Sequence, residues 1–201
     1  MGQPEDEGAD PEEFDFKVGR LGELLVEQRL IEKGWHPVRL DTSQMAANAD
    51  LLAINKAKRI SIQVKTTNAA KKHVHSDHIG LGFTSDKSLD GGPVFNSKAS
   101  PLIADVVVAV RYQMPQSKFV VLPVGLAENL CAKYIKYLKE LPKKDGKTRK
   151  GFGIYLPYLT VSKKHETLGT SISTKLKEFE DRWDILKEEP EILRDPSKWP
   201  I

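Results

Sequence analysis

The chain has 201 residues and is short of cysteine and of long apolar runs. Its one cysteine, Cys131, excludes an intramolecular disulfide framework and is typical of a reducing compartment, so we expect a cytoplasmic protein. Cys131 lies in a helical pattern, where we expect a packing role rather than that of a nucleophile. No apolar run approaches the roughly 18–20 residues that span a membrane, and the acidic start does not resemble an export signal. Neither membrane insertion nor export is expected.

Bases are absent from the first fifteen positions, which carry seven of the 28 acids. Because this segment also has few apolar groups, residues 1–15 are predicted to be an acidic disordered leader. The rest of the chain sets 31 bases against 21 acids, and this excess favours polyanionic partners. The length predicts one domain, placed at residues 16–187, with a surface tail over residues 188–201.

The most informative stretch of the sequence is residues 59–67, where apolar and polar side chains alternate strictly. Period-two alternation with β-branched residues predicts a strand that buries one face. Two polar side chains, a carboxamide and an ammonium, then lie about 7 Å apart along the strand. The alternating residues are Ile60, Ile62 and Val64 on one face and Ser61, Gln63 and Lys65 on the other.

An acid precedes this strand at a distance that suits a hairpin. Asp50 lies 13 positions before Gln63, and the apolar run 51–54 and a polar turn at 55–58 separate the two. A hairpin over residues 50–66 would bring Asp50, Gln63 and Lys65 onto one surface. The sequence therefore predicts a polar cluster at this hairpin.

The remaining periodicities predict an α/β fold with a mixed central β-sheet flanked by helices. Residues 67–100 show little periodicity and are expected to form an irregular or partly helical connection. Strands are predicted at 35–40, 103–110, 118–124 and 151–159, and helices at 16–33, 126–141 and 173–186.

The cluster contains the ligands that a hard divalent cation prefers, namely oxygen atoms with one or two carboxylates among them. Asp50 supplies a carboxylate, Gln63 an amide oxygen and Val64 a backbone carbonyl, while Glu23 in the first helix is placed to hold a metal-bound water. Lys65 would stabilise developing negative charge or polarise the attacking water. These parts suit phosphodiester hydrolysis assisted by Mg²⁺ or Mn²⁺. Glu27, one turn after Glu23, is expected on a solvated helix face.

Taken together, these residues resemble the motif of the PD-(D/E)XK, or restriction-endonuclease-like, nuclease superfamily. That motif is an acid in the first helix, an Asp on the second strand and Asp/Glu-X-Lys on the third, and it matches Glu23, Asp50, Gln63 and Lys65. The superfamily's order of helix, three-strand meander, helix and strand broadly covers residues 16–125. The resemblance implies a restriction-endonuclease-like core and a Mg²⁺-dependent endonuclease that cleaves DNA.

The sequence departs from this motif at two places. Asn48-Ala49-Asp50 stands in place of Pro-Asp and keeps the acid, whereas Gln63 stands in place of Asp or Glu and removes one negative charge from the metal site. A second interpretation is therefore a catalytically degraded nuclease fold that binds nucleic acid or protein. A third is an unrelated α/β protein in which Asp50 and Lys65 form a salt bridge.

Basic residues near the cluster and in a later loop are predicted to contact DNA phosphates. A second metal-binding group, a zinc site at His73, His75 and His78, is an alternative to a polar loop there. The late helix with Phe179 and Trp183 offers either a homodimer interface or packing on the core. The predicted phosphate-binding residues are Lys56, Lys58, Arg59, Lys71, Lys72, Lys143, Lys144, Lys147, Arg149 and Lys150.

Overall fold

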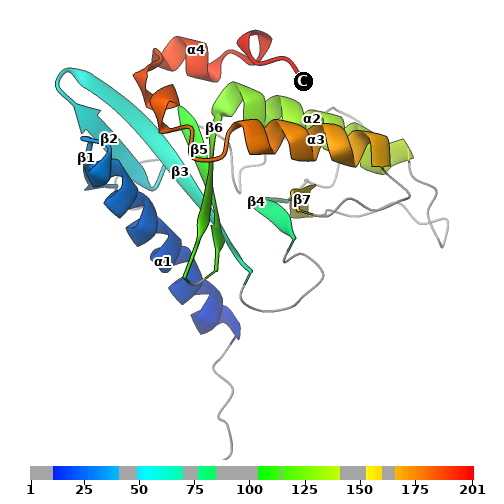
Figure 1. Cartoon of the computed structure of the whole chain (residues 1–201), viewed down its shortest axis with the longest axis horizontal. Coiled ribbons are helices and arrows are strands. Elements are labelled where there is room, and N and C mark those ends of the chain that lie inside the picture. The colour runs from blue at the N-terminus through cyan, green and yellow to red at the C-terminus, as the bar shows by residue number, and fades with distance from the viewer. Residues whose placement is uncertain are drawn as a thin grey trace, which may run out of the picture.

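The computed structural model describes residues 11–40, 49–69, 77–84, 104–113, 115–140, 153–159 and 166–201. Its centre is a five-stranded mixed sheet with the strand order β1-β2-β3-β5-β6, and a two-stranded sheet of β4 and β7 lies beside it (Figure 1). The strands are β1 (His36–Arg39), β2 (Leu51–Asn55), β3 (Lys58–Asn68), β4 (His78–Thr84), β5 (Val106–Tyr112), β6 (Lys118–Pro123) and β7 (Gly153–Pro157).

Helices cover both faces of the central sheet. The long helix α1 lies on one side, and α2 and α3 lie together on the other (Figure 1). This arrangement confirms the predicted fold class, a mixed central sheet flanked by helices. None of the described helices is long and apolar enough to cross a membrane. The helical elements are α1 (Pro11–Glu32), α2 (Val124–Glu140), α3 (Glu166–Glu178), η3 (Trp183–Lys187), α4 (Pro190–Arg194) and η4 (Pro196–Lys198).

The predicted hairpin is present and forms the middle of an antiparallel meander. Strand β2 pairs with β3 in a register that sets Leu51 opposite Ile62, and β1 pairs with the outer edge of β2. The tight turn between β2 and β3 is completed by Lys56 at a φ of 54°. Strand β5 then lies parallel to β3, and β6 lies antiparallel to β5.

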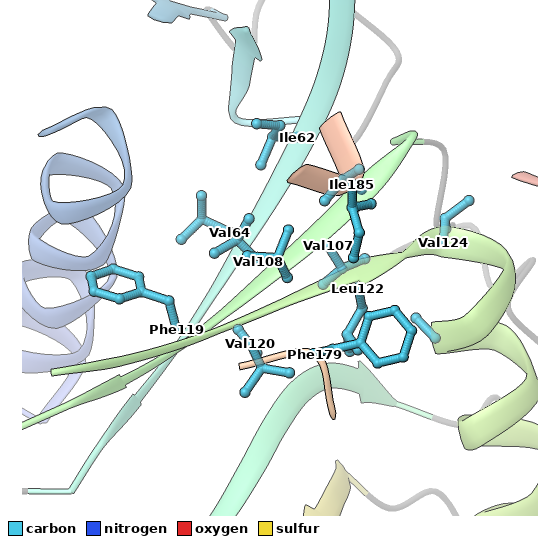
Figure 2. Close-up of a cluster of buried hydrophobic side chains, with 14 of the residues drawn as sticks. Ile62, Val64, Val107, Val108, Phe119, Val120, Leu122, Val124, Phe179 and Ile185 are labelled. Atoms are coloured by element: carbon cyan, nitrogen blue, oxygen red, sulfur yellow. The ribbon is translucent and has the colours of Figure 1, made fainter. Parts of the chain in front are cut away.

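The alternation along the strands assigns side chains to the two faces. Val64, Val108 and Phe119 point toward the α1 side, whereas Leu122 and Phe179 lie on the opposite side (Figure 2). Residues 106–110 of β5 are almost completely buried, as the continuous apolar run predicts for a strand covered on both faces. The core therefore lies on both sides of β3 and β5.

The first helix begins earlier than predicted, at Pro11 instead of residue 16. Proline suits the first turn of a helix because its missing N–H has no partner there in any case. Residues 11–15, which were predicted to belong to a disordered leader, are therefore helical. Residues 1–10 lie outside the described part of the chain.

The last predicted helix, 173–186, is wrong in its second half. Helix α3 ends at Glu178, and Asp181 adopts a φ of 53°, which no helix accommodates. Here the chain runs beside β6: the Val121 amide donates to the Phe179 carbonyl at 2.9 Å. The short helix η3 follows. Phe179 and Trp183 are 6% and 4% exposed, so these two side chains pack in the core and are not an open dimer interface.

The connection between β3 and β5 also differs from the prediction. Strand β3 continues to Asn68, and residues 78–84 form β4, which pairs antiparallel with β7. Strand β7 ends at Pro157, where the sequence predicted a break. In residues 69, 77–84 and 104–105, the described parts of this connection, there is no helix, although the superfamily order implied one.

The final segment is docked on the body of the protein. Leu193 in α4 is completely buried, and the side-chain amide of Asn129 in α2 donates to the carbonyls of Pro196 and Trp199. Gly125 permits this close approach, because a Cβ at that position would lie 2.8 Å from the Asp195 backbone. The segment predicted as a surface tail is thus two short helical elements that close one end of the core.

Candidate active site

The site is built around a local irregularity where β2 begins. The Asp50 amide donates to the Ile62 carbonyl at 2.8 Å, although Ile62 is already paired with Leu51. Two residues of one strand thus oppose one residue of the other, which is the arrangement of a β-bulge. A bulge turns a side chain away from the regular pleat. The Asp50 carboxylate accordingly lies on the edge of β3 and accepts a 2.6 Å hydrogen bond from the Val64 amide.

The backbone of Val64 is oriented toward this carboxylate. In a strand, the amide and carbonyl of one residue face the same edge, so the Val64 carbonyl faces the side on which Asp50 lies. Gln63 and Lys65 flank Val64 and point to the opposite face from the Val64 side chain. This confirms that the hairpin brings Asp50 beside the Gln-Val-Lys stretch.

Gln63 is buried, with 2% of its surface exposed. Its Oε1 atom has no hydrogen-bond partner among the described residues. A buried amide oxygen left without a partner costs about 1–3 kcal/mol. The sequence predicted that β3 buries one face and carries Gln63 on the other, polar face, but Gln63 is buried as well, whereas Ser61 and Lys65 on the same face are half-buried. An oxygen of this kind has a free lone pair available for a cation.

Asp50 and Lys65 change each other's ionisation. Burial raises the pKa of the Asp50 carboxyl, although the Val64 amide and the charge of Lys65 oppose that rise. Burial lowers the pKa of the Lys65 ammonium, and the charge of Asp50 opposes that change. No ion pair joins these two side chains in the described part of the chain, and the Asp50 carboxylate accepts from the Val64 amide. A simple Asp50–Lys65 salt bridge is therefore not what the structure shows.

Glu23 reaches the site because α1 packs very closely on β3. A Cβ added to Gly22 would lie only 1.9 Å from Thr66 Oγ1, so only glycine permits this contact. Glu23 follows directly, and its negative charge contributes to the raised pKa of Asp50. The charge of Asp50 therefore interacts with Glu23 from α1 and with Lys65 from β3, while Gln63 and Lys65 point to the face of β3 opposite to α1.

Two arginines donate hydrogen bonds to the Glu23 carboxylate. Arg20 and Arg39 each donate to Glu23 Oε2 at 2.8 Å. Both also approach Glu27 Oε1, at 3.3 and 3.4 Å. Glu27 was predicted to be a solvated helix-face residue, but it belongs to this four-residue network. No local sequence pattern indicated Arg39, which lies 16 positions from Glu23 and contacts it only through the fold.

The residues present are suited to a hard cation. Asp50, Gln63 and the Val64 carbonyl offer one charged and two neutral oxygens, which is a Mg²⁺ or Mn²⁺ donor set. Among the described residues, no group of three or more His, Cys, Asp and Glu side chains could hold a metal. Any metal here would therefore depend on the amide and backbone oxygens. His73 and His75 of the alternative zinc site lie outside the described residues, and His78 opens β4.

Three of the predicted DNA-contact residues lie in the described part of the chain, at the hairpin turn and away from this site. Lys56, Lys58 and Arg59 lie at the hairpin turn, and Lys58 is about 23 Å from Lys65 along the extended strand at 3.3 Å per residue. Lys58 also pairs with Glu189 at 3.0 Å and donates to the Lys187 carbonyl. The remaining predicted contacts lie outside the described residues; they are Lys71, Lys72, Lys143, Lys144, Lys147, Arg149 and Lys150.

Comparison with known proteins gives one similar solved structure and no family. No protein-family model matches the chain, and neither does any curated protein. A bacterial homing endonuclease, I-Ssp6803I, is similar in structure, with a TM-score of 0.45 and 14% sequence identity. The similarity covers 85% of this chain and 91% of that one.

Proposed function

We propose that this protein is a metal-dependent DNA endonuclease of the PD-(D/E)XK type. The observation that carries the proposal is the buried Gln63 Oε1, which has no partner among the described residues and lies on the same strand as Lys65. A fold tolerates such an atom where a function needs it. The Asp50 carboxylate accepts a hydrogen bond from the amide of Val64, the residue between these two, and adds a charged oxygen to the proposed metal ligands.

Each residue has a distinct role in this proposal. Asp50, Gln63 and the Val64 carbonyl would hold the cation, and Glu23 would orient a water. The cation, when bound, lowers the pKa of water and neutralises phosphate charge. The Lys65 ammonium is half-buried, so its charge acts on a neighbouring phosphate oxygen with little screening by solvent. Burial also lowers the pKa of Lys65, so proton transfer between this side chain and an attacking water becomes easier.

The decisive experiment removes Lys65. Lys65→Ala should abolish Mg²⁺- or Mn²⁺-dependent cleavage of mixed DNA substrates and leave folding and most DNA binding intact. Lys33→Ala is the matched control, because Lys33 is exposed just after the end of α1. Unchanged cleavage by the Lys65 variant would show that the site has been assigned to the wrong residues.

The alternative function is a nuclease fold that binds nucleic acid or protein without cleaving it. Two observations favour it: Gln63 is neutral, and Glu23 is already paired with Arg20 and Arg39. Titrating Mg²⁺ and Mn²⁺ against wild type and Gln63→Glu distinguishes the two functions. Salt-sensitive DNA binding without cleavage by either protein would establish the binding module. Cleavage by wild type would exclude it.

A further inference from the structure

Arg39 lies next to the candidate site, although no part of the nuclease motif includes it. It is the last residue of β1 and pairs with Leu51, and the amide of the following residue, Leu40, donates to the Asp50 carbonyl at 3.0 Å. Neighbouring strands are about 4.8 Å apart, so Arg39 is one strand spacing from the segment that carries Asp50. Its positive charge also opposes the rise in the Asp50 pKa.

The Arg39 side chain is held in place but remains accessible. Its Nη2 donates to Glu23 Oε2 at 2.8 Å and its Nε lies 3.4 Å from Glu27 Oε1, while 52% of the side chain is exposed. A guanidinium has five N–H donors in a planar fork that matches two phosphate oxygens. Two acids thus orient the fork and leave part of it facing solvent.

We propose that Arg39 is a phosphate-contact residue, which binds a backbone phosphate of the nucleic acid beside the one that reaches Asp50. In the free protein Glu23 and Glu27 hold the guanidinium and compete with that phosphate for it. This inference rests on the proposed function, because it requires a polyanionic strand across the site. Arg39 lies nearer to Asp50 than the predicted phosphate contacts at the hairpin turn, Lys56, Lys58 and Arg59.

Arg39 fits this role better than the other cations near Asp50. Arg20 is only 30% exposed and bonds to the same two acids from within α1. Lys65 is half-buried on the face of β3. Lys58 lies at the far end of β3 and is paired with Glu189. Arg39 alone among these four combines proximity to Asp50 with an exposed, planar donor group.

The test measures binding rather than cleavage. Fluorescence anisotropy with a labelled DNA duplex, without divalent metal and over a series of salt concentrations, gives the affinity and its salt dependence. Arg39→Gln should weaken binding about tenfold and reduce the slope of log K against log salt by about 0.9, the value for one phosphate. Arg182→Gln is the control, because Arg182 is 50% exposed and paired with Asp184 at the start of η3, which packs on β6 at the opposite edge of the central sheet from β1. Its affinity and slope should equal those of wild type.

A second variant separates a phosphate contact from a general change in charge. Glu27→Gln should tighten binding by releasing Arg39, and this gain should be smaller when Arg39 is also replaced by Gln. Equal gains in both backgrounds, or an unchanged slope for Arg39→Gln, would overturn the inference while leaving the proposed function intact. If wild type itself does not bind DNA, the proposed function fails together with the inference. Circular dichroism confirms folding, and Arg39→Met, which also removes the charge, replaces the Gln variant if that variant unfolds.

Discussion

The Asp50 carboxylate accepts its hydrogen bond from the amide of Val64, the residue between Gln63 and Lys65. The acid is therefore fixed to the backbone of β3 instead of to another side chain. Any shift of β2 along β3 would move Asp50 relative to both neighbours of Val64 at once. The bulge at Asp50 and Leu51 thus sets the position of the Asp50 carboxylate relative to Gln63 and Lys65.

Gly22→Ala should destabilise the protein by about 1–3 kcal/mol, the usual cost of overpacking. The added methyl would lie 1.9 Å from Thr66 Oγ1 and 3.0 Å from Thr66 Cβ, so α1 or the strand must move. Urea denaturation measures the free energy of unfolding. Gly19→Ala, in the same helix with no atom within 4 Å, should instead stabilise by up to about 1 kcal/mol. Two equal effects would show that α1 does not approach β3 closely at Gly22.

Gln63→Glu should make stability depend on divalent metal. Without metal, the added charge is buried beside Asp50, and the melting temperature should fall below that of wild type. With Mg²⁺ it should recover, because a ligand at 100 times its Kd stabilises the folded state by about 2.7 kcal/mol. Thermal melts with and without Mg²⁺ measure this difference. Adding Asp50→Asn to the variant should abolish the response to metal.

The raised pKa of Asp50 should appear in the pH dependence of stability without metal. The folded state binds the proton more tightly than the unfolded state, so stability should fall as the pH rises from 3.8 through the raised pKa. Asp50→Asn keeps an acceptor for the Val64 amide but cannot titrate, and it should lose this component. Urea denaturation at a series of pH values compares the two proteins. A wild-type profile parallel to that of Asp50→Asn would contradict the prediction.

Tyr158→Phe should lower the free energy of unfolding by about 2 kcal/mol. The reason is that the fully buried Tyr158 donates its hydroxyl hydrogen to the Glu180 carboxylate. Burial would raise the pKa of Glu180, but hydrogen bonds from Lys118 and Tyr158 hold it below 4.5. This contribution is present above pH 4.5 and is lost as the pH falls through the lowered pKa. The variant should therefore lose more stability at pH 7 than at pH 3 in urea titrations. A pH-independent loss would mean that packing alone is responsible.

The strand pattern allowed much of the fold to be predicted. The alternation in β3 and the apolar run in β5 report directly which faces are covered, so the hairpin and the central strand follow from them. The break after Glu178 could not be foreseen in this way. Leu176, Phe179, Trp183 and Leu186 keep a helical spacing and are all buried, yet the positive φ of Asp181 redirects the chain along β6. Spacing shows which residues are buried but does not show the path between them.

The candidate site was predictable only in the residues that lie close together in sequence. Asp50, Gln63 and Lys65 share one hairpin, whose register follows from its apolar residues. The pairing of Glu23 with Arg39 depends on how α1 crosses β1, and the burial of Gln63 depends on what covers the sheet. Neither of these two features leaves a pattern in the local sequence. The prediction that Glu27 lies on a solvated helix face was wrong for the same reason, because its contact with Arg39 arises only in the folded chain.

The docking of the final segment has a consequence for folding kinetics. Arg194 Nε bonds to the buried Asp105 at 2.6 Å across 89 residues of sequence, and Lys58 pairs with Glu189 across 131. Closing such long loops is slow, because chain entropy is lost before the contacts form. These contacts should form late and open first, so backbone amides in residues 190–199 should exchange with deuterium faster than those of β3 and β5.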